Sequence, residues 1–134
     1  MSPRTAFLAR LIGLYSILVA LSMITHKQAT VVMVTALVRN PPGLFIVGVI
    51  TLGVGLAMVL GHNVWSGGAL AVIVTLIGWL ALIKGLLFLF LSPDAAVGFF
   101  LGGFRYEQLF YLYASISLVL GVYLTYGGFR STSR

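Results

Sequence analysis

Cysteine is absent from this chain, and acidic residues are nearly so, with two among 134 residues. Without thiols there can be no disulfide, iron–sulfur ligation, palmitoylation or thiol catalysis. The two carboxylates, Asp94 and Glu107, are too few for a carboxylate metal site. Zinc-protease, serine-hydrolase and phosphate-loop motifs are missing too. We therefore expect neither an enzyme nor a cofactor.

Charge of either sign is scarce, and apolar residues dominate. Hydrophobic residues make up 60% of the chain, charged residues 7%, and the mean hydropathy is +1.13. Such a chain has too little polar surface to coat a soluble domain. Its net charge of +6 is spread over scattered basic residues, which favours anionic lipid head groups over nucleic acid as partners. The composition predicts an all-α membrane protein.

Four hydrophobic stretches are long enough to cross a bilayer core of ~30 Å. They predict helices at about residues 7–25, 44–61, 68–91 and 105–126, in an antiparallel bundle that forms one domain over residues 1–134. Two further apolar segments, 29–38 and 95–104, are too short to span, so we expect them at the membrane interface. The second could also be shallowly re-entrant.

Four spans place both termini on one side of the membrane, and the basic residues bear on which side that is. The terminal side carries Arg4, Arg10, Arg130 and Arg134, against Lys27, Arg39 and Arg105 opposite. Excess Lys and Arg mark the cytoplasmic side, which predicts cytoplasmic termini. Dual topology remains an alternative.

Small residues lie at helical spacing where helices can approach closely. Gly53, Ala57 and Gly61 form a small-xxx-small series in the second predicted span, and Gly78 and Gly85 mark a packing stripe on the third. We expect the first series to drive self-association into a homo-oligomer.

Lys84 is the charge that most needs an explanation, because an ammonium group inside a bilayer costs several kcal/mol (~2.5–3.5 on insertion scales). Its stem can snorkel towards the head groups, or it can pair with Glu107 at the start of the fourth predicted span. The functional alternative is that Lys84 binds an anion or moves a proton.

His62, Asn63 and Trp65 lie between the second and third predicted spans, at a membrane surface. There tryptophan anchors a protein, and His or Asn caps a helix C-terminus. The alternative is a head-group or solute site at the mouth of the bundle. Haem is excluded, because the other histidine, His26, is expected at the opposite face.

The series His62-Asn63-x-Trp65, followed by Thr75-Leu76-x-Gly78-Trp79-x-x-Leu82-x-Lys84-Gly85, resembles a group of small four-helix integral membrane proteins of bacteria. The resemblance covers mainly residues 44–93. It implies architecture only, and it groups His62, Asn63, Trp65, Trp79 and Lys84 as one unit. The location that we expect is a bacterial inner membrane. It implies no activity.

Two functions fit these patterns. The first is a non-catalytic membrane subunit or scaffold that self-associates. The second is a small oligomeric channel or transporter for an anion or neutral solute, whose pathway would use Lys84, Tyr113, Ser115 and Ser117.

Overall fold

A computed structural model describes residues 2–103 and 108–130 of the protein. Throughout these ranges every regular element is helical. The elements are α1 Pro3–Thr25, α2 Lys27–Val38, α3 Pro41–Gly61, α4 Ala69–Phe90, α5 Pro93–Val97, the π-helical η1 Gly98–Gly103, and α6 Phe110–Arg130. By length and composition, α1, α3, α4 and α6 can each cross a membrane. The prediction of an all-helical chain with four candidate spans is confirmed.

Polar caps fix where the helices begin. The Ser2 hydroxyl accepts the N–H of Thr5 at the start of α1, and the Asn40 side chain accepts the N–H of Gly43 at the start of α3. Pro41 and Pro42 occupy the first turn of α3, where the lack of an N–H costs nothing. The expected start of this helix at residue 44 was therefore too late.

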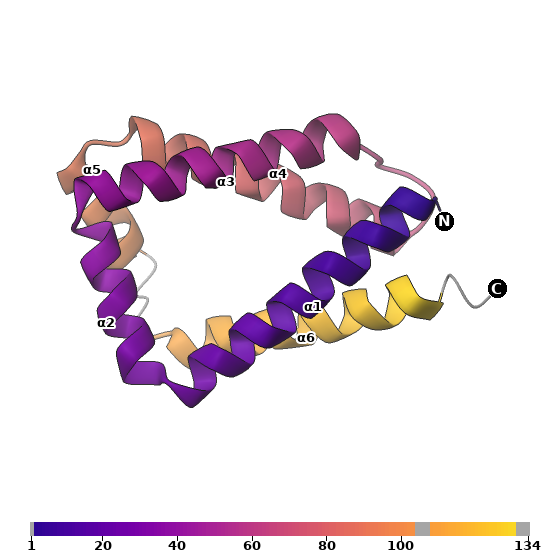
Figure 1. Ribbon diagram of the computed structural model, residues 1–134, viewed down its shortest axis with the longest axis horizontal. Helices are drawn as coiled ribbons and strands as arrows, with labels where there is room; N and C mark the ends of the chain where they lie inside the picture. The colour runs from indigo at the N-terminus through magenta and orange to yellow at the C-terminus, as the bar shows by residue number, and fades with distance from the viewer. Residues whose placement is uncertain (1, 104–107, 131–134) are drawn as a thin grey trace.

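The four long helices form two tight pairs, α1 with α6 and α3 with α4 (Figure 1). Glycine permits both contacts. A Cβ added to Gly121 of α6 would lie 2.8 Å from the carbonyl oxygen of Gly13 in α1, and one added to Gly85 of α4 would lie 2.6 Å from the backbone nitrogen of Leu52 in α3. Any larger side chain would push these backbones apart.

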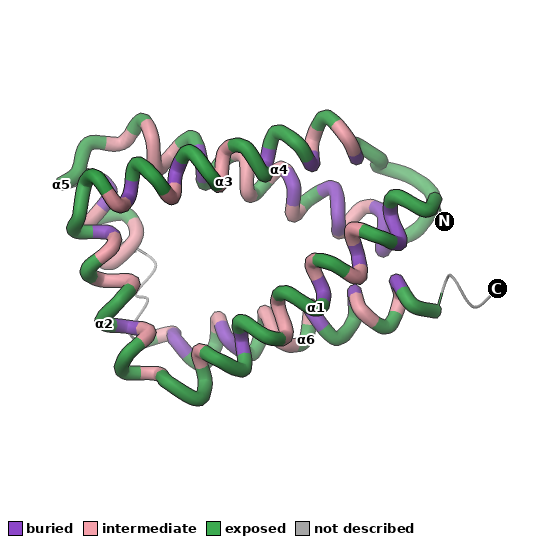
Figure 2. The backbone as a smooth tube through the Cα atoms, viewed as in Figure 1, coloured by how far each residue is buried: buried purple, intermediate pink, exposed green. Residues whose placement is uncertain are grey.

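The two pairs converge at one end of the molecule and diverge towards the other (Figure 1). We call the end with the 62–68 connection the narrow end, and the end with α2 the wide end. At the narrow end the pairs share a hydrophobic core, made of Ala9, Met58, Leu70, Val74 and Leu124. Buried positions lie where helices meet, while the outward faces are exposed (Figure 2).

At the wide end α2 crosses from the end of α1 to the start of α3 (Figure 1). Its 12 residues correspond to a length of about 18 Å, which exceeds the 8–10 Å or so between packed helix axes. The second short segment, α5 with η1, folds onto α4, where the rings of Phe100 and Phe88 lie 4.7 Å apart. Both short apolar segments are thus helical and cover the wide end.

The end of α6 differs from its prediction. The sequence placed it at Tyr126, before Gly127 and Gly128, yet the helix continues to Arg130. A Cβ on Gly128 would lie 3.0 Å from the backbone nitrogen of Arg10, so this glycine lets α1 approach rather than ending the helix. At its other end α6 begins at Phe110, and predicted helical positions 105–107 lie outside the described residues.

Candidate functional site

A buried polar cluster joins the two helix pairs at the narrow end. His62 follows the last residue of α3 and is 3% exposed. Its Nε2 lies 2.7 Å from the hydroxyl of Thr5 in α1, and its Nδ1 lies 3.1 Å from the hydroxyl of Thr75 in α4. We call Ser2, Thr5, His62 and Thr75 the histidine cluster. It holds together three helices that belong to both pairs.

The hydrogen bonds around Thr75 determine the proton arrangement in a neutral imidazole. Its hydroxyl lies 2.8 Å from the Val64 carbonyl oxygen and accepts the Val64 N–H at 3.1 Å. With the single Thr75 proton on a carbonyl oxygen, that of Val64 or that of Ala71 at 3.0 Å, the Nδ1 of a neutral His62 donates to Thr75 and its Nε2 accepts from Thr5. Ser2, 2.9 Å from the Thr5 hydroxyl, completes the chain. Both ring nitrogens of His62 therefore have hydrogen-bond partners within the cluster.

The residues beside His62 are also tied down. One oxygen, Oδ1 of Asn63, accepts from the indole N–H of Trp65 at 2.7 Å and from that of Trp79 at 3.3 Å. Trp79, in the middle of α4, thus reaches back to the connection between α3 and α4. Four residues that the sequence grouped, His62, Asn63, Trp65 and Trp79, therefore lie together.

Sequence reasoning missed the partners of His62. Thr5 and Thr75 are 2% and 1% exposed, and each bonds the imidazole directly. Arg4 donates from Nη1 to the Gly61 carbonyl oxygen at 2.7 Å, at the negative end of α3. The available signal was a threonine in the first turn of one apolar helix and another threonine within the uncharged stretch of α4 that precedes Lys84.

Lys84 is far from this cluster. It lines a cavity of about 730 Å³ at the wide end, whose walls come from α1, α2, α3, α4, η1 and α6. Among the described lining residues Lys84 alone is charged; hydroxyls come from Tyr15, Thr51 and Tyr113, and the rest are apolar. The structure thus separates Lys84 from the unit to which the resemblance assigned it.

The ammonium group of Lys84 has one described neighbour of note, the Phe88 ring, whose centroid is 5.6 Å from Nζ. That distance allows a cation–π contact. No hydrogen bond or ion pair joins Lys84 to another residue within 2–103 or 108–130. Its predicted partner Glu107 lies outside the described residues.

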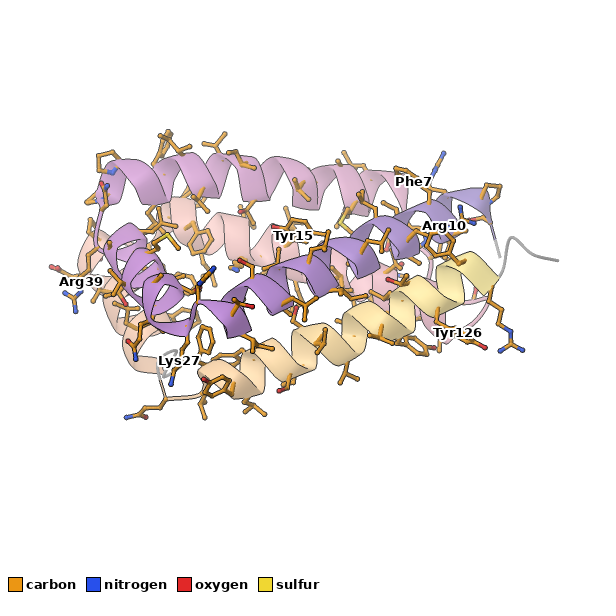
Figure 3. The ribbon with its side chains drawn as sticks, turned by 60° about the horizontal axis from the view of Figure 1, so that its bottom comes forward. Phe7, Arg10, Tyr15, Lys27, Arg39 and Tyr126 are labelled. Carbon is orange, nitrogen blue, oxygen red and sulfur yellow. The ribbon has the colours of Figure 1, made fainter. Side chains whose placement is uncertain are left out.

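The other basic residues within 2–103 and 108–130 lie at the two ends of the molecule. Figure 3 shows Arg10 near the narrow end, and Lys27 and Arg39 at the wide end. Arg10 donates from Nε to the Gly128 carbonyl oxygen at 3.1 Å, and its guanidinium carbon is 4.9 Å from the Phe129 ring centroid. It therefore folds onto the C-terminal end of α6. His26, which follows α1, lies a whole helix away from His62.

These features define a class: a small all-helical protein with four apolar helices of membrane-spanning length, a polar cluster at one end and a cavity at the other. No family model, curated protein or solved structure matches the chain. The apolar helices fit the architecture that the motif resemblance implies, and no family identity follows from them.

Proposed function

We propose that this protein is a non-catalytic, multi-pass membrane protein that works as a self-associating subunit. The proposal rests on one apolar face of α3, whose small residues include glycines that no other part of the same copy packs against. A Cβ on Gly53 or Gly61 would meet nothing within 4 Å, whereas one on Gly48 or Gly55 of the same helix would meet α4.

A lipid-facing glycine needs a reason, because glycine is a poor helix former. Gly53 and Ala57 are both exposed on α3. Around them lie exposed apolar side chains, including Ile50 at 62% and Leu60 at 83%. Small residues flanked by large apolar ones allow two membrane helices to approach at backbone range. A second copy of the chain accounts for this face.

The absence of catalysis is supported by the state of the polar groups. In the histidine cluster both imidazole nitrogens and the Thr75 hydroxyl are used in structural hydrogen bonds. Such a network rigidifies the fold, and the hydroxyl that faces the imidazole, that of Thr5, is 2% exposed and out of reach of a substrate. Within the described residues no group of three or more His, Cys, Asp or Glu is placed to hold a metal ion.

The orientation that we propose follows from the narrow end. The start of α1 and the end of α6 both lie there (Figure 1), and these helix ends carry Arg4, Arg10 and Arg130. In a bacterial inner membrane the side rich in arginine is cytoplasmic. We therefore place the narrow end in the cytoplasm and α2 with η1 at the outer interface.

Ala57→Leu tests the self-association. The added carbons would separate two helices that pack at Ala57, so we expect the variant to run as a smaller species in mild detergent. Ser115→Leu is the matched control, because it puts leucine at an exposed small residue of α6. Light scattering or analytical ultracentrifugation reports the mass. The interface is wrong if Ala57→Leu keeps the wild-type mass, or if the control dissociates equally.

The transport alternative has weaker support. Lys84 and Tyr113 line the wide-end cavity, while Ser115 and Ser117 do not. The hydrophobic core occupies the narrow end, opposite the cavity. A pathway through one copy would have to cross that core. The geometry therefore favours a binding cavity over a conduction pathway.

A further inference from the structure

The wide-end cavity combines an apolar wall with a single cation. One stripe of α4 shows both features, since Leu80, Ile83, Lys84 and Leu87 follow helical spacing and all line the cavity. Leu80 is 64% exposed and Ile83 49% exposed, so their side chains are not covered by protein. At about 730 Å³ the cavity falls within the range of small-molecule sites, roughly 300–1,000 Å³.

The fold holds this cavity open. The glycines of α4 face α3, with Gly78 against Met58 and Gly85 against Leu52, whereas Leu80 and Ile83 of the cavity-lining stripe are exposed. On the other side, α2 separates the two pairs by more than the distance between packed helices. The exposed side chains of Leu80 and Ile83 belong to the wall of the cavity, and in the proposed orientation they face the lipid of the surrounding membrane. A bilayer molecule can therefore approach sideways.

In a bilayer, apolar contacts between an acyl chain and the cavity wall contribute little to binding. An acyl chain that moves from lipid into an apolar cavity gains little, because lipid tails are as apolar as the cavity wall. The ammonium group provides the selectivity. A cation in low-dielectric surroundings, with no ion pair among the described residues, is stabilised most by an anion brought next to it.

We propose that the wide-end cavity binds a membrane phospholipid with an anionic head group, whose phosphate pairs with Lys84 and whose acyl chain lies along Leu80 and Tyr15. A phosphodiester stays ionised there, whereas burial raises the pKa of a carboxyl group and favours its neutral form. This site is independent of the self-association face, since Ala57 is not among the cavity residues.

The depth of Lys84 suits a lipid lying in its ordinary orientation. It precedes the last residue of α4, Phe90, by six positions, or about 9 Å along the helix. The lysine stem can reach back part of that way. Head group and ammonium then meet within roughly two helical turns of the wide-end surface. The acyl chain points towards the middle of the membrane, where Tyr15 lies midway along α1 (Figure 3).

The test measures lipid selectivity of the purified full-length chain by native mass spectrometry from mild detergent. Phosphatidylglycerol and phosphatidylcholine with identical acyl chains are added in turn. Both lipids carry a phosphodiester, but in phosphatidylcholine the choline cation neutralises the head group and competes with Lys84 for the phosphate. We therefore expect wild type to retain phosphatidylglycerol about tenfold more tightly. Lys84→Met should reduce that ratio to near one. Equal binding of both lipids by wild type would overturn the proposal.

Lys27→Met is the control for general attraction to basic surfaces. Lys27 is also a wide-end cation, packed over the Tyr111 ring at 4.8 Å, but it does not line the cavity. The Lys27→Met variant should keep the wild-type preference for phosphatidylglycerol. It should keep this preference at high salt as well, where surface charges are screened. Loss of selectivity in Lys27→Met equal to that in Lys84→Met would assign binding to the surface and overturn the site.

A second variant keeps the lysine and fills the space. Leu80→Trp adds volume one turn from Lys84, and Leu80 is exposed enough to be replaced without disturbing packing. We expect it to lose retention of phosphatidylglycerol although the cation remains. Glycerol phosphate, which lacks chains, and a long-chain fatty acid should compete poorly with the phospholipid. Displacement by the fatty acid at equal concentration would contradict the assignment to a phospholipid.

Discussion

At the scale of single residues, the histidine cluster accounts for more of the architecture than any other polar group. The single hydroxyl of Thr75 takes part in three such interactions: it accepts the Val64 N–H, bonds the His62 imidazole and donates to a carbonyl oxygen. Buried polar groups cost most when a partner is removed and least when all are satisfied. The cluster is therefore a structural joint whose failure should be measurable as instability.

Thr75→Val removes the hydroxyl at nearly constant volume. The Val64 N–H and one imidazole nitrogen then lose their partner, which should lower the free energy of unfolding by about 1–3 kcal/mol. Thermal unfolding in detergent measures the loss. Thr25→Val is the control, because the exposed Thr25 hydroxyl only donates to Leu21 within its own helix. Comparable losses in the two variants would show that the cluster adds no stability of its own.

Single residues were predictable only where local chemistry decides their role. A serine followed by proline is a local pattern typical of a helix N-terminus, and in the structure Ser2 caps α1 with Pro3 in its first turn. The partners of His62 were not readable, because a threonine within an apolar helix also bonds its own backbone in many proteins. Thr5, His62 and Thr75 become neighbours only because the helices pack together, and no local sequence pattern predicts which helices do so.

At the scale of helices, glycine positions distinguish two kinds of helix face. Gly55 and Gly53 lie two residues apart on α3, yet a Cβ on Gly55 would run into the Leu82 backbone, while one on Gly53 meets nothing. Gly55→Ala should therefore destabilise the fold by about 1–3 kcal/mol through overpacking. Gly53→Ala should be neutral or slightly stabilising for a single copy, since alanine favours the helix.

This pair is measured as denaturation midpoints at a protein concentration low enough to disfavour oligomers. The two variants have the same chemistry on the same helix, so each controls the other. Equal midpoints would mean that α3 and α4 are not packed as described.

Helix existence was easy to predict and helix ends were not. Hydropathy located all four long helices because each needs a long apolar run. The predicted start of α3 was wrong because Pro41 and Pro42 lie in the first turn of the helix, where proline is tolerated. The predicted end of α6 was wrong because Gly127 and Gly128 lie within the helix, where Gly128 packs against α1. The expected Lys84–Glu107 pair concerns a residue outside the described ranges and stays a prediction.

At the scale of the whole molecule, the two pairs are packed within themselves and meet at one end. Hydropathy could not foresee this, because small residues occur on faces of every long helix and fit several pairings. The predicted single bundle would instead keep the pairs side by side over their full length.

Distances between spin labels distinguish the two arrangements. The chain has no cysteine, so pairs can be introduced without a background. Phe7→Cys with Leu60→Cys reports the narrow end, and Leu21→Cys with Phe45→Cys the wide end, all at exposed positions of α1 and α3. We expect the second distance to exceed the first by about 10 Å, the excess of α2 over a packed interhelix spacing. Equal distances would favour the single bundle.

The 12 residues of α2 also separate two properties of the cavity that usually change together. The width of the cavity follows from the number of residues that connect α1 to α3. Its selectivity follows from the side chains of α4 that line it. Changes at Leu80 or Lys84 can therefore alter what is accepted while leaving the spacing of the pairs intact, and a longer or shorter α2 can alter size while leaving the chemistry intact. The width of the cavity and its selectivity can therefore be altered independently, by changes in different helices.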